Sequence, residues 1–173
     1  MNSSTPNILL TGASGKLGNT IKQSQLFTNL LTPAQEKLDI TNPTSIQAFF
    51  KNNIFNTIIH CAAQARMALA EKDPITTLQA NVVGTAHLVS AIIKKERNEN
   101  KSIRFVHIST DGVYHCDRGN YSEESPTIPY NKYGWTKLGA ECSVNLLSNF
   151  CIIRTAFFDP HSIPFEDSAV DGF

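Results

Sequence analysis

Short apolar runs recur along the chain and are continuous rather than alternating. The clearest are residues 8–11, 57–61, 105–108 and 151–154. Continuous runs of this length are typical of strands that are covered on both faces, as in a parallel sheet with helices on each side. Two weaker runs, 28–32 and 37–39, are further candidate strands between the first and second predicted helices.

A helical spacing of three and four separates these runs. From Pro74 onward the pattern predicts a helix of about five turns, because proline suits a first turn and one apolar stripe follows it. We expect that stripe to face a core; it consists of Ile75, Leu78, Val82, Val89 and Ile92, with the small Thr85 in the same seam.

Two other helices are indicated by their start signals. Asn42 followed by Pro43 is a side-chain cap before a residue that needs no donor, so a helix carrying Ile46, Phe49 and Phe50 is expected there. Another helix is expected over residues 131–147. The resulting β-α-β order predicts an α/β fold with a doubly wound parallel sheet and right-handed crossovers.

The length of 173 residues fits one domain, residues 1–173. Within it, residues 156–173 have no assignable period and are expected to form an irregular tail. The loop over residues 114–129 is long for a compact domain, and loops of this kind tend to be functional.

Charge and apolar content exclude several classes of protein. Fifteen Lys and Arg balance fifteen Asp and Glu, so neither nucleic acid nor a membrane surface is an expected partner. No segment is apolar enough to span a membrane, and the polar start lacks a signal pattern, which predicts a soluble, cytoplasmic protein. The four cysteines form no C-x-x-C pair, so buried free thiols and no metal site are expected.

Three glycines follow the first predicted strand at intervals of three, in the sequence TGASGKLG of residues 11–18. Gly12 suits a tight turn and close approach of a phosphate, and Gly18 suits close packing of the helix on the strand. A dinucleotide pyrophosphate would then lie at the N-terminus of the helix. The alternative is an ordinary glycine turn.

Tyr133 and Lys137 are four residues apart and therefore lie on one face of a helix. A nearby cation lowers the pKa of a phenol, which would make Tyr133 a better proton donor near neutral pH. Ser109, Thr110 and Asp111 end a buried strand at its carboxyl end, where ligands bind in open α/β sheets. The alternatives are a surface pair and a polar turn that ends the strand.

Together these motifs resemble the extended branch of the short-chain dehydrogenase/reductase superfamily, and within it the dTDP-4-dehydrorhamnose reductase-like (RmlD-like) sugar-nucleotide reductases. The resemblance covers about residues 7–158. It rests on several motifs in the family's order: residues 11–18 (TGASGKLG), 38–43 (LDITNP), 59–63 (IHCAA), 70–74 (AEKDP), 81–84 (NVVG), 108–111 (ISTD), 121–124 (YSEE) and 133–137 (YGWTK).

The resemblance implies an NAD(P)-binding Rossmann fold and roles for individual residues. By position, the catalytic hydroxyl falls on Thr110, the proton donor on Tyr133, and the lysine that also holds the nicotinamide ribose on Lys137. The implied cofactor-binding residues are Gly12, Ser14, Gly15, Lys16, Leu17 and Gly18 around the pyrophosphate, Asp39 and Ile40 beside the adenine, Ala62, Ala63 and Gln64 along the cofactor channel, and Asn81, which supports the active site.

The implied reaction is reduction of a nucleotide-linked 4-keto-6-deoxy sugar with NADP or NAD, whose identity residues 30–37 do not reveal. Gly112 stands where the dehydratases of this branch carry an acidic residue, which disfavours dehydration. Family members are longer, so a C-terminal substrate lobe is expected to be missing here, and they are often homodimers. The alternatives are a nucleotide-sugar epimerase, and a non-catalytic NADP-binding regulatory subunit like the methionine adenosyltransferase β subunit, which the chain's length and Ala68 in place of an acidic residue favour.

Overall fold

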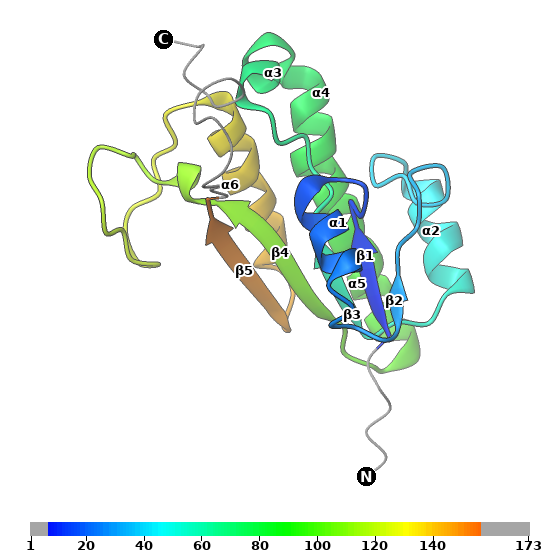
Figure 1. Cartoon of the computed structure of the whole chain (residues 1–173). Coiled ribbons are helices and arrows are strands. Elements are labelled where there is room, and N and C mark those ends of the chain that lie inside the picture. The colour runs from blue at the N-terminus through cyan, green and yellow to red at the C-terminus, as the bar shows by residue number, and fades with distance from the viewer. Residues whose placement is uncertain (1–6, 157–173) are drawn as a thin grey trace.

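The structure, a computed structural model, describes residues 7–156. Five parallel strands form one sheet in the order β2-β1-β3-β4-β5 (Figure 1). Their bounds are β1 Ile8–Thr11, β2 Leu30–Leu31, β3 Thr57–His60, β4 Arg104–Thr110 and β5 Phe150–Thr155. From β1 the chain moves outward to β2 and then crosses back to β3 on the other side, as in a doubly wound sheet.

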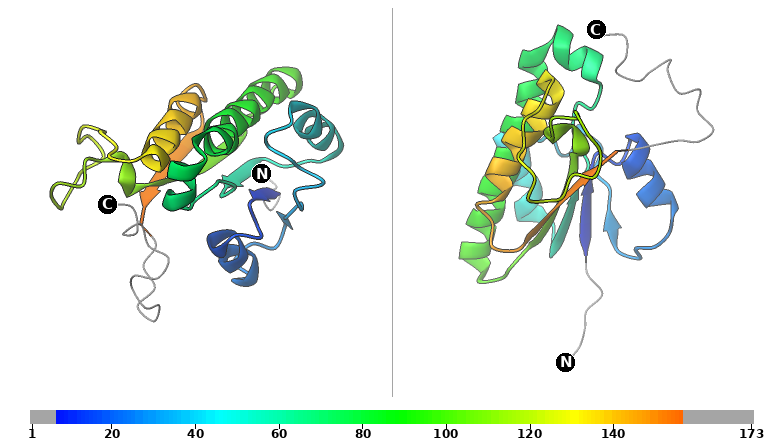
Figure 2. Two further views of the ribbon diagram at one scale, coloured as in Figure 1. Left: turned by 90° about the horizontal axis from the view of Figure 1, so that it is seen from above. Right: turned by 90° about the vertical axis from the view of Figure 1, so that its left-hand side faces the viewer.

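Helices cover both faces of this sheet, which confirms the predicted fold class. Helix α1 lies on one face, and α2, α5 and α6 lie on the other (Figure 2). The helical segments are α1 Lys16–Gln23, α2 Pro43–Asn52, α3 Met67–Lys72, α4 Pro74–Leu78, the π-helical turn η1 Gln79–Val83, α5 Gly84–Glu99, the 3₁₀ turn η2 Asp111–Val113 and α6 Lys132–Val144.

Most of the predicted elements are present in the structure. The run 28–32 contains β2, but the run 37–39 forms no strand because the Leu38 amide donates to the Ala34 carbonyl and the Asp39 amide to Ser45 Oγ. The short helix α3 was not predicted. The predicted tail falls outside the described residues from 157 onward.

Both predicted helix starts are confirmed by side-chain caps. Asn42 Oδ1 accepts from the amides of Thr44 and Ser45 at the start of α2. Asn131 Oδ1 accepts from the amide of Gly134 at 2.7 Å and so caps α6, the helix that carries Tyr133 and Lys137. Each cap satisfies donors that the first turn leaves without a partner.

The helix predicted from Pro74 is interrupted by a π-helical turn. Part of its apolar stripe faces solvent, so the prediction that the whole stripe faces a core is wrong. Ile75 is 73% exposed and Leu78 46% exposed, whereas Val89 and Ile92 are buried as expected. The π turn over Gln79–Val83 adds a residue to one turn and shifts the helical phase between the two parts. The buried positions near its N-terminal part are polar instead: Thr77, Asn81 and Thr85.

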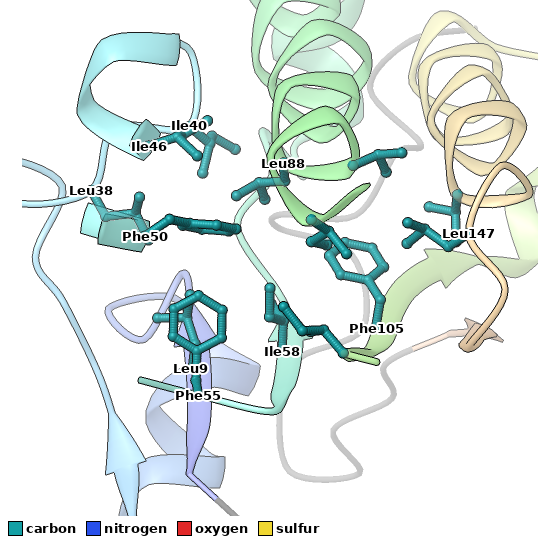
Figure 3. Close-up of a cluster of buried hydrophobic side chains, with 14 residues drawn as sticks. Leu9, Leu38, Ile40, Ile46, Phe50, Phe55, Ile58, Leu88, Phe105 and Leu147 are labelled. Carbon is teal, nitrogen blue, oxygen red and sulfur yellow. The ribbon is translucent and has the colours of Figure 1, made fainter. Parts of the chain in front are cut away.

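The main core lies between the sheet and helices α2, α5 and α6 (Figure 3). Leu9 and Ile58 from the sheet are fully buried there against Leu88 of α5, and Phe105 lies close to the C-terminal end of α6. A smaller cluster of Ile8, Leu10 and Ile59 forms under α1. These two clusters pack against the two faces of the sheet. The candidate site lies at the carboxyl ends of the same strands.

The described cysteines are free, but only two are shielded. Cys61 and Cys151 are half-buried, whereas Cys116 and Cys142 are exposed, so the prediction of buried thiols is wrong for the latter pair. Both exposed residues lie outside the strands, in the loop after η2 and on the outer side of α6. Among residues 7–156 there is no helix with the length and apolar character needed to cross a membrane.

Candidate active site at the carboxyl ends of the strands

The loop after β1 packs too closely for side chains at two of its glycines. Gly12 has a φ of +71°, and a Cβ on it would lie 2.5 Å from the backbone nitrogen of Ala62. A Cβ on Gly18 would strike the Gly12 carbonyl and lie 2.8 Å from Ala13 Cα. The tight turn at Gly12 and the close packing of the helix at Gly18 are therefore present as predicted.

This loop leads directly into the N-terminus of α1. Gly15 is the N-cap and supplies no side-chain acceptor, while its amide donates to the Gly12 carbonyl at 3.0 Å. Ser14, Gly15 and Lys16 are exposed and Leu17 is half-buried. The first-turn amides of α1 thus point outward without a side-chain cap, which suits a negatively charged group.

The loop lies beside the end of β3, at the point where the strand order reverses. Gly12 follows β1 and Ala62 follows β3, and these two strands are neighbours in the sheet. In open α/β sheets, ligands bind in the crevice at such a switch point. The half-buried Ala62, Ala63 and Gln64, which are the predicted channel residues, follow β3 in this region.

Asn81 links that segment to helix α6. Its Oδ1 accepts from the Gln64 amide at 2.8 Å, and its Nδ2 donates to the Gln64 carbonyl and to Thr136 Oγ1, each at 3.0 Å. Thr136 in turn donates to the Tyr133 carbonyl at 2.8 Å. Asn81 lies in the π-helical turn, a feature common at functional sites, and joins the segment after β3 to α6.

The two hydroxyls at the end of β4 have different surroundings. Ser109 Oγ donates to Glu141 Oε1 at 2.5 Å beneath α6. Thr110 Oγ1 accepts from the Gly112 amide at 3.1 Å and donates to Asp111 Oδ1 at 3.2 Å. Because neighbouring residues of a strand point to opposite faces, the Thr110 hydroxyl lies away from Glu141, in the turn that follows β4.

Helix α6 is pressed against the same strand end. A Cβ on Gly134 would strike the carbonyl oxygen of Gly112 and lie 2.9 Å from Pro129 Cβ. One turn later, Lys137 Nζ donates to the Ile108 carbonyl at 2.6 Å. These contacts bring the helix that carries Tyr133 and Lys137 to the carboxyl end of β4, next to Thr110.

The environment of Tyr133 differs from the one predicted. Burial, with a smaller contribution from the negative charge of Asp111, raises the pKa of the Tyr133 phenol instead of lowering it. Burial also lowers the pKa of Lys137 to about 8, against opposing contributions from Glu141 and Cys61. The prediction of a lowered phenol pKa is wrong here because the Lys137 ammonium bonds the Ile108 carbonyl and desolvation dominates.

The two predicted adenine-side residues have different surroundings, since Asp39 is half-buried and Ile40 is buried. Asp39 Oδ1 accepts from the amide and the hydroxyl of Thr41, at 2.9 and 2.7 Å. Ile40 is 9% exposed and belongs to the main core, where it packs on Gly84. The structure thus brings the glycine loop, the β3 segment and the α6 residues together at one edge, whereas the Ile40 side chain points into the core.

Three residues of this region were not predicted as a group. Glu141 is 2% exposed and receives bonds from Ser109 and from Arg154 of β5. Two features of the sequence could have indicated this group: Arg154 is a charged residue within the apolar run 151–154, and Glu141 is an acidic residue one turn after Lys137. No sequence rule connects two such residues across separate elements.

The chain is similar to known proteins in sequence and in structure. The family model described as RmlD substrate binding domain matches residues 6–161. The dTDP-4-keto-6-deoxy-D-glucose reductase of Streptomyces niveus is 35% identical over 160 residues, which cover 88% of this chain and 53% of that protein. The methionine adenosyltransferase 2 subunit beta of Mus musculus is 28% identical over 146 residues, or 79% of this chain and 42% of that protein.

A solved structure is also similar. The dTDP-4-dehydrorhamnose reductase of Bacillus anthracis, crystallised in complex with NADP, matches with a TM-score of 0.80 at 28% identity and covers 89% of this chain and 54% of that one. The chain therefore spans about half the length of the relatives it matches.

Proposed function

The chain belongs to the RmlD substrate-binding domain family, and on this premise we propose that it acts as an NADP-dependent reductase of a nucleotide-linked 4-keto-6-deoxy sugar. The observation that carries the proposal is the attachment of α6 to the carboxyl end of β4. Lys137 and Gly134 make this attachment next to Thr110, while the glycine loop lies two strands away at the same edge.

NADP is the proposed cofactor, with NAD as the alternative, because the similar Bacillus anthracis reductase was crystallised with NADP. The close approach of the backbone at Gly12 and Gly18 and the uncapped first turn of α1 fit a pyrophosphate. Ser14, Gly15, Lys16 and Leu17 would surround it, and Asp39 and Ile40 would flank the adenine. Ala62, Ala63, Gln64 and Asn81 would line the channel toward Tyr133 and Lys137.

When held by the glycine loop and Lys137, the reduced cofactor would supply the hydride for the ketone carbon. Tyr133 donates its phenolic proton to the ketone oxygen, and the raised pKa of Tyr133 keeps that proton in place before substrate binds. The Thr110 hydroxyl turns from Asp111 to donate to the same oxygen. Lys137 would hold the ribose of the bound cofactor.

Further parts of the proposal concern the whole protein. We propose that residues 1–173 form one NAD(P)-binding domain and that the protein resides in the cytoplasm, where free thiols such as Cys116 stay reduced.

A homodimer is also proposed. It is supported by Ile75, Leu78 and the 55% exposed Trp135, which lie on the contacting helices α4 and α6. Sedimentation of Trp135→Glu, with Leu146→Glu as control, tests the dimer.

The function is tested first by cofactor binding. Trp135 is the sole tryptophan and lies two residues after Tyr133, so bound NADPH should accept its excitation energy. Saturable binding of NADPH, followed by its oxidation on addition of dTDP-4-dehydrorhamnose, supports the proposal. Failure to bind either NADPH or NADH contradicts it.

Two alternatives predict other outcomes of the same experiment. An epimerase would retain its cofactor on purification and give no net oxidation of added NADPH. A regulatory subunit is favoured by the likeness to the mouse methionine adenosyltransferase subunit. It would bind NADPH, leave the sugar nucleotide unreduced, and hold an enzyme partner equally well after Tyr133→Phe.

A further inference from the structure

A buried ion pair connects three elements beneath the proposed catalytic residues. Arg154 of β5 donates from Nη2 to Glu141 Oε2 at 2.7 Å and from Nε to both carboxylate oxygens, at 3.1 and 3.2 Å. Glu141 belongs to α6, and its side chain is almost fully buried. Such a bidentate geometry fixes the carboxylate in one orientation.

The oriented carboxylate reaches the end of β4. Ser109 Oγ donates to Glu141 Oε1 at 2.5 Å, and Ser109 is opposite Arg154 in the register of β4 and β5. Lys137, one turn earlier on α6, donates to the Ile108 carbonyl. Helix α6 is therefore bonded to two consecutive residues of β4, and the next residue is Thr110.

The same arginine also reaches the long loop that follows η2. Arg154 Nη1 donates to Tyr114 Oη at 2.8 Å and to the Glu123 carbonyl at 3.3 Å, and its guanidinium lies 5.1 Å from the Tyr114 ring centroid. The Tyr114 ring stacks on the Tyr121 ring. Arg154 thus holds both ends of the segment between Tyr114 and Glu123 while it orients Glu141.

We propose that Glu141, oriented by Arg154, is a positioning residue that holds Thr110 in place relative to Tyr133 and Lys137. This inference rests on the proposed function, which supplies the role of Thr110. The Glu141 side chain accepts from Ser109, the residue before Thr110. Glu141 also lies on α6, the helix that carries Tyr133 and Lys137, so one side chain connects all three groups. Glu141 also counteracts the lowering of the Lys137 pKa by burial.

The Gly112 amide is a direct reporter of this role, because it donates to Thr110 Oγ1. We expect Ser109→Ala and Glu141→Gln to speed hydrogen exchange at that amide at least about tenfold. Amides of β1 and β3 should stay within about twofold of the unmodified chain. Glu99→Gln is the matched control, since it removes the exposed carboxylate of the Lys95–Glu99 pair on α5.

A merely structural role of the ion pair predicts a different pattern. If both variants leave the Gly112 amide unchanged, or speed exchange equally across the sheet, the positioning role is overturned. Ser109→Ala keeps the ion pair and decides the matter should Glu141→Gln fail to fold. The exchange measurement needs neither cofactor nor substrate, so its outcome is separate from that of the NADPH titration.

Turnover gives the second readout of the same proposal. In a chain that reduces the sugar nucleotide, Glu141→Gln should lower kcat at least about tenfold and leave the Kd for NADPH within about twofold. This split is expected because Glu141 contacts the Thr110 strand and not the glycine loop. Equal losses in kcat and in NADPH affinity would contradict a role specific to Thr110.

Discussion

Thr11 Oγ1 lies 2.7 Å from His60 Nδ1, deep between β1 and β3. The hydroxyl of Thr85 donates to the Asn81 carbonyl, so it can only accept from His60 Nε2 at 3.1 Å. His60 Nε2 therefore carries a proton, and since burial lowers the pKa of His60 and keeps its ring neutral, Thr11 donates to Nδ1. The Ala62 amide donates to Thr11 Oγ1. A relay of hydrogen bonds through His60 therefore connects Thr11, at the start of the glycine loop, with Asn81 of the π turn.

This relay predicts a dependence of stability on pH. Burial, reinforced by the positive charge of Lys137, lowers the pKa of His60 to about 3 and that of His107 well below its usual range. Below about pH 6.5 these histidines become protonated in the unfolded chain but stay neutral in the folded chain. The free energy of unfolding therefore falls as the pH falls. His60 alone should lower the free energy of unfolding by about 1 kcal/mol between pH 7.5 and pH 5.5, and His107 should act in the same direction.

Urea unfolding at the two pH values measures this loss. His60→Gln should remove about 1 kcal/mol of it, whereas His115→Gln is the matched control because His115 is exposed in the loop after η2. A His60→Gln chain that loses as much stability as the unmodified chain would show that His60 is already protonated in the fold. Nitrogen-15 spectra of the ring give an independent check, with the proton expected on Nε2.

The glycine loop gives a second prediction. Gly18→Ala forces a methyl group against the Gly12 carbonyl and Ala13 Cα, so it should displace α1 from β1. We expect a loss of about 1–3 kcal/mol in the free energy of unfolding. The Kd for NADPH should rise at least about tenfold. Thermal unfolding and the fluorescence titration measure the two effects.

Gly119→Ala is the control for this substitution, because nothing lies within 4 Å of a Cβ at that position. It should leave both quantities unchanged. Should Gly18→Ala bind NADPH as tightly as Gly119→Ala, the pyrophosphate does not lie at the N-terminus of α1.

A third prediction concerns the proposed proton donor. Tyr133→Phe removes only the phenolic hydroxyl and should lower kcat by about 10²–10⁴-fold. The Kd for NADPH should stay within about twofold, because the glycine loop is untouched. Tyr130→Phe is the matched control, since the Tyr130 phenol lies 3.9 Å from Met67 Sδ on a 45% exposed side chain and has no proposed role in the reaction. Equal turnover of the two variants would remove Tyr133 from the mechanism.

The sequence predicted those features that residue type alone determines. The strand runs, the asparagine caps and the glycine positions follow from local preferences of backbone and side chain. By contrast, the exposure of Ile75 and Leu78 depends on a π turn, for which no local signal is known in this segment. The relay through His60 joins residues that are 49 and 25 positions apart, and the raised pKa of Tyr133 depends on burial, so neither could be predicted from spacing.

The close contact between α6 and η2 leads to the last prediction. Gly134→Ala places a methyl group against the Gly112 carbonyl and 2.9 Å from Pro129 Cβ, so the start of α6 must move away from the turn that follows Thr110. Since Tyr133 precedes Gly134, its phenol moves too. We expect kcat to fall at least about tenfold, as misplacement of a catalytic group by about 1 Å can cost 10²-fold.

Gly139→Ala, on the same helix, is the matched control. Its added Cβ would lie 3.2 Å from Cγ2 of Val82, a side chain that can shift, and it contacts neither η2 nor β4. Steady-state kinetics of the two variants should therefore differ, with turnover retained in Gly139→Ala and lost in Gly134→Ala while both bind NADPH. Comparable activity of both variants would mean that catalysis does not depend on the contact between α6 and the Thr110 turn.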